Sequence, residues 1–386
     1  MKTTRLVKIV IPLIVLSGPA RQALAIGPDY QIVPTALQTT TPASSVVDFL
    51  GTATSTSDYG TGSIIDKYWS NGIDYALVLT ADHVASDAGQ GSGAYQDYVA
   101  VGPNNDTAGT SIYQEQLLSA PLANGFSIGI GGPNPATNFE DIDIMRIMFG
   151  NASSPAVTAL FNSIIPMDIS YPGINQFGAN GGTNAPFTQY GYGYAGQPVV
   201  QGATAGYASY DRPFNLRFQN NLLTYVNTNY TSPFNSSINS QGAGKPYSEP
   251  LAHYNTLAPV NQLNGGAGLH GDSGGPFVYL SSQPVTVTNY SSNPISGRIY
   301  TDWQFAVFVG GKDGGTNWTL VNYNPPGGST TVAATLNGDD QYGVYIDQSN
   351  YNWIESIMGS VPEPATTTIL AVGGSLLLLY RRCRSR

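Results

Sequence analysis

The chain has few charged residues and almost no cysteine. Charged side chains make up 10% of its 386 residues, and the single cysteine, Cys383, lies at the C-terminal end. This excludes an intramolecular disulfide, so the folded body depends on its core and its hydrogen bonds. The three histidines are dispersed, and neither H-E-x-x-H nor a cysteine pair is present, so no metal site is predicted. The glycine-rich segments lack the lysine or acidic context of nucleotide-binding loops, and we expect chemistry without a cofactor.

Positive charge is nearly absent from the body of the chain. Eight of the 15 lysines and arginines lie before residue 26 or after residue 380. Residues 26–380 therefore hold seven basic and 24 acidic side chains, which gives a net charge of −17. A surface this acidic repels phosphate backbones and anionic lipid, so nucleic-acid binding and a polybasic membrane contact are disfavoured.

Turn-forming residues are abundant, with 45 glycines and 26 prolines, and 25 tyrosines accompany them. Short apolar runs lie between the turns, and three of them, 75–79, 142–148 and 305–309, predict strands. The segments 84–138 and 196–266 are rich in Gly, Asn, Ser, Tyr and Pro, and we interpret them as loops or insertions. The composition therefore predicts an all-β protein with long loops.

The N-terminal 25 residues have the pattern of a secretory signal peptide. Three basic residues, Lys2, Arg5 and Lys8, precede an apolar run at 9–16, and Ala23-Leu24-Ala25 has the form of a cleavage site. The alternative is an uncleaved anchor, but the apolar run is short for a membrane span.

The C-terminal end has three parts in a fixed order. Val361-Pro362-Glu363-Pro364 precedes an apolar stretch at 365–380, and a basic tail at 381–386 follows. This segment (359–386) resembles the PEP-CTERM sorting signal of bacterial envelopes. The resemblance implies export, passage of the C-terminal segment through the membrane before processing, and two partners, signal peptidase and an exosortase-type sorting enzyme. A plain C-terminal anchor is the alternative, and in both cases the body faces outward.

The motif Gly271-Asp272-Ser273-Gly274-Gly275-Pro276 carries the strongest chemical signal. A serine hydroxyl becomes a good nucleophile when a base removes its proton and donors accept the negative charge on the attacked carbonyl. Glycines around the serine allow the backbone to approach a substrate closely. The alternative is an ordinary glycine-rich turn.

A histidine that suits the role of base follows an apolar run, in Thr80-Ala81-Asp82-His83. An isolated histidine in such a place is more often structural. Together with the serine motif, however, this segment resembles the T-A-x-H segment of the chymotrypsin-like serine proteases. The order histidine, acid, serine agrees with that family and differs from the order in subtilisin and in the α/β-hydrolases.

The resemblance also selects the acid that orients the histidine. Asp143-Ile144-Met145-Arg146-Ile147 resembles the family's aspartate-led strand, so the triad expected is His83, Asp143 and Ser273. Asp141 is the competitor, two residues earlier; Asp143 is preferred because the apolar run follows it directly.

The resemblance extends from about Gly60 to Met358 and implies a fold. Segment 187–193 resembles a strand ending in G-W/Y-G, while 343–345 and 351–354 resemble a G-V-Y strand and a C-terminal W-I helix. The expected fold is all-β, with two six-stranded antiparallel β-barrels of the chymotrypsin type, loop insertions and a short C-terminal helix. The expected protease domain, 26–358, has barrels at about 45–150 and 185–346 and a helix at about 350–358.

The family pattern also assigns the residues around the serine. The amides of Gly271 and Ser273 are expected to form the oxyanion hole. Ala267 is expected at the base of the substrate pocket, with Gly310 (or Gly311) and Gly343 as its open walls. His270 is expected at the pocket rim, and Leu269 stands where the family has a cysteine.

Asp272 is expected to form a structural ion pair. Its partner is either an amine freed at Ile26 by signal-peptide cleavage or an internal donor.

These expectations together describe a secreted, envelope-anchored serine endopeptidase that acts on proteins or peptides. Without a carboxylate in the pocket, the residue on the acyl side of the cut should be uncharged. The alternatives are a catalytically inactive protease-like surface or matrix-binding protein and a structural component of an exopolysaccharide matrix.

Overall fold

The computed structural model describes part of the chain. The described residues are 31–32, 42–50, 58–70, 72–88, 98–101, 113–116, 140–151, 155–169, 185–193, 195–201, 204–210, 216–235, 246–255, 271–286, 299–312, 319–323, 332–337 and 340–360. The predicted signal peptide, residues 361–386 of the PEP-CTERM segment and the residues Ile26, Ala267, Leu269 and His270 lie outside them.

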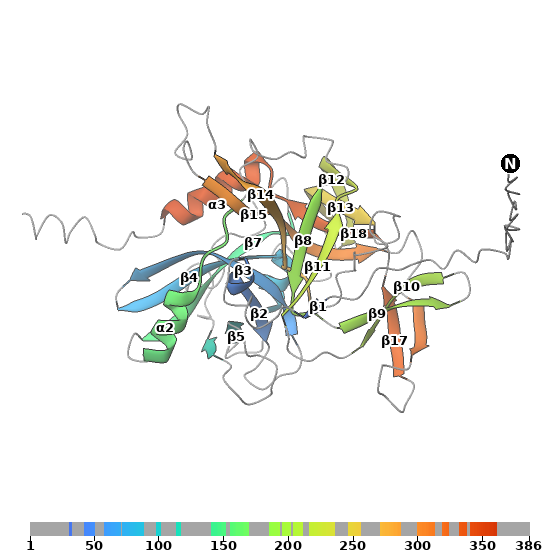
Figure 1. The fold of residues 1–386 in the computed structure, drawn as a ribbon, viewed down its shortest axis with the longest axis horizontal. Coiled ribbons are helices and arrows are strands. Elements are labelled where there is room, and N and C mark those ends of the chain that lie inside the picture. The colour runs from blue at the N-terminus through green and yellow to red at the C-terminus, as the bar shows by residue number, and fades with distance from the viewer. Residues whose placement is uncertain are drawn as a thin grey trace, which may run out of the picture.

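The first half of the chain forms a six-stranded antiparallel sheet in the order β6-β5-β2-β3-β4-β7 (Figure 1). Its strands are β2 (Val46–Leu50), β3 (Asp58–Ser70), β4 (Ile73–Thr80), β5 (Tyr98–Val101), β6 (Tyr113–Gln116) and β7 (Asp143–Asn151). β3 and β4 pair as a hairpin in which Ser70 lies opposite Ile73, and Gly72, just before β4, has a φ of 85°. Glycine adopts that conformation without steric cost, which suits a two-residue hairpin turn.

Seven strands from residue 186 onward, together with β1 near the N-terminus, form an eight-stranded antiparallel sheet in the order β1-β11-β8-β14-β15-β18-β13-β12. Its strands are β1 (Gln31–Ile32), β8 (Pro186–Gly191), β11 (Arg217–Leu222), β12 (Tyr225–Asn235), β13 (Pro246–Asn255), β14 (Pro276–Thr286), β15 (Ile299–Lys312) and β18 (Asp340–Tyr345). A separate four-stranded sheet contains β9 (Ala195–Gln201), β10 (Thr204–Tyr210), β16 (Thr319–Tyr323) and β17 (Val332–Asn337). Figure 1 shows it at the right-hand side of the molecule.

The described part of the chain contains one 3-10 turn and three α-helices. They are the 3-10 turn η1 (Ala43–Ser45), α1 (Asp82–Ala88) directly after β4, α2 (Pro155–Ser163) after β7, and α3 (Gln348–Ser360) after β18. Among the described residues, none of the helices has the length and apolar character required to cross a membrane.

One hydrophobic core joins the two large sheets. Its buried side chains include Leu79 and Ile144 from the first sheet and Phe277 and Phe305 from the second. Polar contacts cross the same boundary, since the Ser63 hydroxyl donates to the Gln304 side chain at 2.5 Å. The shared core fixes the facing edges of the two sheets, where the candidate site lies.

The all-β prediction is confirmed, and the three apolar runs at 75–79, 142–148 and 305–309 lie largely in β4, β7 and β15. The interpretation of 196–266 as loops is wrong, because most of β9 and all of β10 to β13 lie there; 84–138 likewise contains β5, β6 and most of α1. Strands β9 to β13 contain Asn, Gly and Pro, which have low β-propensity, so their pairing in a sheet overrides weak local propensity. Within the described residues, hydrogen bonding closes neither large sheet into a barrel.

Candidate functional site

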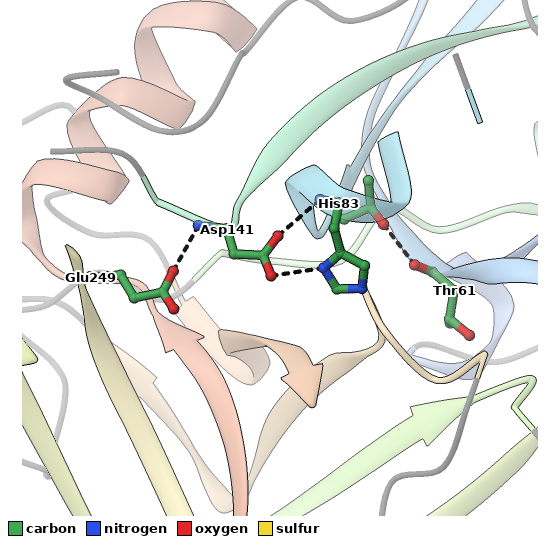
Figure 2. Close-up of polar contacts among 5 residues, drawn as sticks. Thr61, His83, Asp141 and Glu249 are labelled. Atoms are coloured by element: carbon green, nitrogen blue, oxygen red, sulfur yellow. Dashed lines mark hydrogen bonds and ion pairs between the residues drawn. The ribbon is translucent and has the colours of Figure 1, made fainter. Parts of the chain in front are cut away.

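His83 lies in the first turn of α1, and the buried carboxylate of Asp141 contacts its Nδ1 atom. Asp141 Oδ2 lies 2.7 Å from His83 Nδ1, and Asp141 Oδ1 accepts the His83 backbone N–H at 2.9 Å (Figure 2). The Asp141 side chain is 2% exposed and the His83 side chain 25% exposed. With a proton on Nδ1 donated to Asp141, the Nε2 atom is left as the acceptor that a general base needs.

The structure corrects the prediction that Asp143 orients the imidazole. Asp143 is the first residue of β7, opposite Thr80 of β4, and its Oδ1 accepts the N–H of Ile144 at 2.6 Å. Asp141 lies in a bend before β7 begins and outside the strand pairing. Because Asp141 precedes the strand, its backbone can turn the carboxylate toward the start of α1, and it takes the place expected for Asp143.

Ser273 lies in a tight turn directly before β14. Gly271 and Gly274 have φ values of 88° and 86°, a left-handed conformation that disfavours other residues. Gly275 N–H donates to the Asp272 carbonyl at 2.8 Å, which closes the turn, and Ser273 remains partly exposed. Within the described residues, the amides of Gly271 and Ser273 donate to no acceptor, which is the condition required of oxyanion-hole donors.

Gly60 of β3 shows how closely the serine turn approaches the histidine helix. A Cβ atom on Gly60 would lie 2.5 Å from Val84 Cγ2 and 2.7 Å from the Ser273 carbonyl oxygen. Val84 follows His83 in α1. The Val84 side chain and the Ser273 backbone therefore both pack against Gly60, which has no side chain to separate them. The fold therefore brings the segments that carry Ser273 and His83, 190 positions apart in sequence, close to the same glycine.

Asp272 is buried and has an internal donor. The Gly193 N–H donates to Asp272 Oδ1 at 2.7 Å, and Arg217 Nη1 donates to the Gly193 carbonyl at 2.9 Å. A Cβ atom on Gly191 or Gly193 would clash with the Asp272 carboxylate, so the glycines of the G-Y-G segment make room for this group. Of the two partners considered for Asp272, the structure contains the internal one; Ile26 lies outside the described residues.

Two buried glutamates near the histidine were not identified from the sequence. Glu249 of β13 accepts the Asp141 N–H through Oε2 at 2.7 Å, and Figure 2 shows Glu249, Asp141 and His83 in a row. Glu140 is buried beside α3, and this burial raises its pKa to about 8, partly offset by a hydrogen bond from Asn350. Glu140 lies just before β7 and Glu249 lies within β13, and neither belongs to a sequence motif, so no local signal pointed to either residue.

The predicted pocket residues have different outcomes. Ala267 and the rim residue His270 lie outside the described residues. Gly310 is partly exposed at an irregularity in the pairing of β15 with β18. Gly343 is buried, and a Cβ atom there would lie 2.9 Å from Phe277 and 3.0 Å from the Val307 carbonyl oxygen. Its missing side chain therefore makes room for the core, which differs from the open pocket wall expected.

No protein-family model matches the sequence, and no curated protein matches it. Within the described part of the chain, no group of three His, Cys, Asp or Glu side chains is arranged to hold a metal ion.

Proposed function

We propose that the protein is a serine endopeptidase in which Ser273 is the nucleophile, His83 the general base and Asp141 the group that orients His83. The observation that supports this most directly is the pairing of a partly exposed histidine with a buried aspartate beside the serine turn. A buried aspartate that binds the Nδ1 side of a histidine sets its tautomer and stabilises its protonated form.

In the proposed reaction, Ser273 Oγ forms a bond to the carbonyl carbon of the substrate, and its proton moves to His83 Nε2. The amides of Gly271 and Ser273 bind the oxyanion. The C–N bond then breaks, and the proton on Nε2 passes to the leaving amine. A water oxygen then bonds to the acyl carbon while a water proton moves to Nε2. The bond between the acyl carbon and Ser273 Oγ breaks, Oγ takes the proton from Nε2, and the acid product leaves.

The arrangement of the sheets supports a more specific fold assignment. The six-stranded sheet precedes the serine turn, and the eight-stranded sheet contains it, with α3 after the last strand. We assign these sheets to the two barrels of a chymotrypsin-type protease, on the strength of the sequence resemblance.

The substrate and location follow from the sequence. With Ala267 at the pocket base, the enzyme should prefer an uncharged residue on the acyl side of the cut; a peptide-library profile dominated by Arg or Lys would contradict this. The terminal segments support export to a bacterial cell envelope, with sorting by an exosortase-type enzyme.

A fluorophosphonate probe tests the function, because it reacts with an activated serine and not with an ordinary one. The wild-type protein should be labelled at Ser273, and Ser273→Ala should abolish both labelling and peptide hydrolysis while the protein stays folded. Ser163, an exposed serine at the end of α2, gives the control variant Ser163→Ala, which should be labelled like wild type. An unlabelled, folded wild-type protein would favour the inactive protease-like alternative.

A further inference from the structure

Thr61 of β3 connects the two halves of the site. Its backbone N–H donates to the Ser273 carbonyl at 2.7 Å, and its carbonyl accepts the Thr80 hydroxyl at 2.8 Å. Thr80 is three residues before His83. Thr61 therefore links the histidine segment to the serine turn through two hydrogen bonds, and Figure 2 shows it on the side of the His83 ring away from Asp141.

The Thr61 hydroxyl adds two contacts that its backbone does not supply. Oγ1 donates to the Gly271 carbonyl at 2.9 Å and accepts the Tyr192 N–H at 3.0 Å. Thr61 is fully buried, and Gly271 and Tyr192 are also buried. Loss of a hydrogen-bond partner is unfavourable for a buried carbonyl and for a buried amide, so the hydroxyl holds both groups in place.

Gly271 has a φ of 88°, and a glycine backbone can adopt many other conformations at little cost. The hydrogen bond from Thr61 to the Gly271 carbonyl therefore restricts the conformation of this residue. The chain has no disulfide that could hold this turn, since its only cysteine is Cys383. We propose that the Thr61 hydroxyl is the positioning group that keeps Gly271 in the conformation required of an oxyanion-hole donor. This inference rests on the proposed protease function.

Thr61→Val tests the inference, because valine has the same shape and lacks the hydroxyl. The two backbone hydrogen bonds of residue 61 remain, so the variant changes only the contacts with Gly271 and Tyr192. Removing an oxyanion-hole donor lowers kcat about 10²- to 10³-fold, and a displaced donor should lower it at least about tenfold. We expect the kcat of Thr61→Val to be at least about tenfold lower than that of the wild type, with KM within about threefold of the wild-type value.

A second readout separates oxyanion binding from general loss of structure. A peptide boronic acid forms a tetrahedral adduct with the serine, and its affinity for Thr61→Val should fall in parallel with kcat. Thr61→Ser keeps a hydroxyl and should restore both values to within about threefold of wild type. The matched control is Thr188→Val, which removes another buried threonine hydroxyl, bonded to Asn220 Oδ1 at 2.7 Å in β11.

The outcomes are distinguishable. A wild-type protein that does not react with the fluorophosphonate would overturn the protease proposal and this inference with it. A reactive wild type with Thr61→Val equal to it in kcat, or with Thr188→Val impaired to the same degree, would overturn the role of Thr61 alone. If Thr61→Val does not fold, Thr61→Ala replaces it, because alanine removes the hydroxyl without adding a methyl group.

Discussion

Replacing Asp141 by asparagine should nearly abolish activity, because one carboxylate receives two hydrogen bonds from His83. Oδ1 accepts the backbone N–H and Oδ2 faces Nδ1. An asparagine has one accepting oxygen. If that oxygen accepts the backbone N–H, its NH₂ group faces Nδ1 and favours the tautomer with the proton on Nε2, which cannot accept the serine proton.

The expected loss is large. In serine proteases this change of the triad aspartate lowers kcat about 10⁴-fold, which corresponds to about 5 kcal/mol of transition-state stabilisation. The assay is steady-state hydrolysis of a fluorogenic peptide by the wild type, Asp141→Asn and Asp143→Asn at one pH near neutrality. Circular dichroism and thermal unfolding show whether each variant is folded.

Asp143→Asn is the matched control, two positions away and equally buried. Its carboxylate accepts the Ile144 N–H, and an asparagine oxygen accepts the same donor, so kcat/KM should stay within about tenfold of wild type. A folded Asp141→Asn protein with wild-type turnover, or an Asp143→Asn protein with the larger loss, would refute the pairing of His83 with Asp141.

Three further predictions concern stability and the serine turn. Burial raises the Glu140 pKa from 4.5 to about 8, so between these pH values the folded protein retains a proton that the unfolded chain has lost. The free energy of unfolding should therefore fall as pH rises through that window, by at most about 5 kcal/mol, and urea titrations at pH 5 and 8 should show a smaller fall for Glu140→Gln. A wild type and variant with equal pH dependence would contradict the assignment. Gly193→Ala introduces a Cβ that clashes with the Asp272 carboxylate, so fluorophosphonate labelling should slow at least about tenfold; an unchanged rate would show that the turn tolerates displacement of Asp272. Because Gly193 supplies an internal donor to Asp272, adding Met-Ala before Ile26 should leave peptide turnover unchanged, and a large loss would instead indicate activation by the N-terminal amine.

Local pattern was sufficient where the signal lies within a few residues. The apolar runs in β4, β7 and β15 are almost continuously buried, and a short apolar run bounded by turn residues is a signal that the sequence shows directly. The turn with Ser273 was recognisable because its glycines, with positive φ at Gly271 and Gly274, are required by the turn itself. His83 was identifiable because the apolar strand that places it ends three residues earlier.

Tertiary structure decided what depends on distant contacts. Asp141 and Asp143 are two residues apart and chemically identical, and which one meets His83 depends on where β7 starts and where α1 lies against it. Thr61 and Glu249 join the site only because β3 and β13 are brought to it by sheet pairing, more than 100 positions from their partners Gly271 and Asp141. The sequence alone determined the chemical groups and their local turns. The fold determined which of those groups touch, because a hydrogen bond depends on positions within a few ångströms that no short segment specifies.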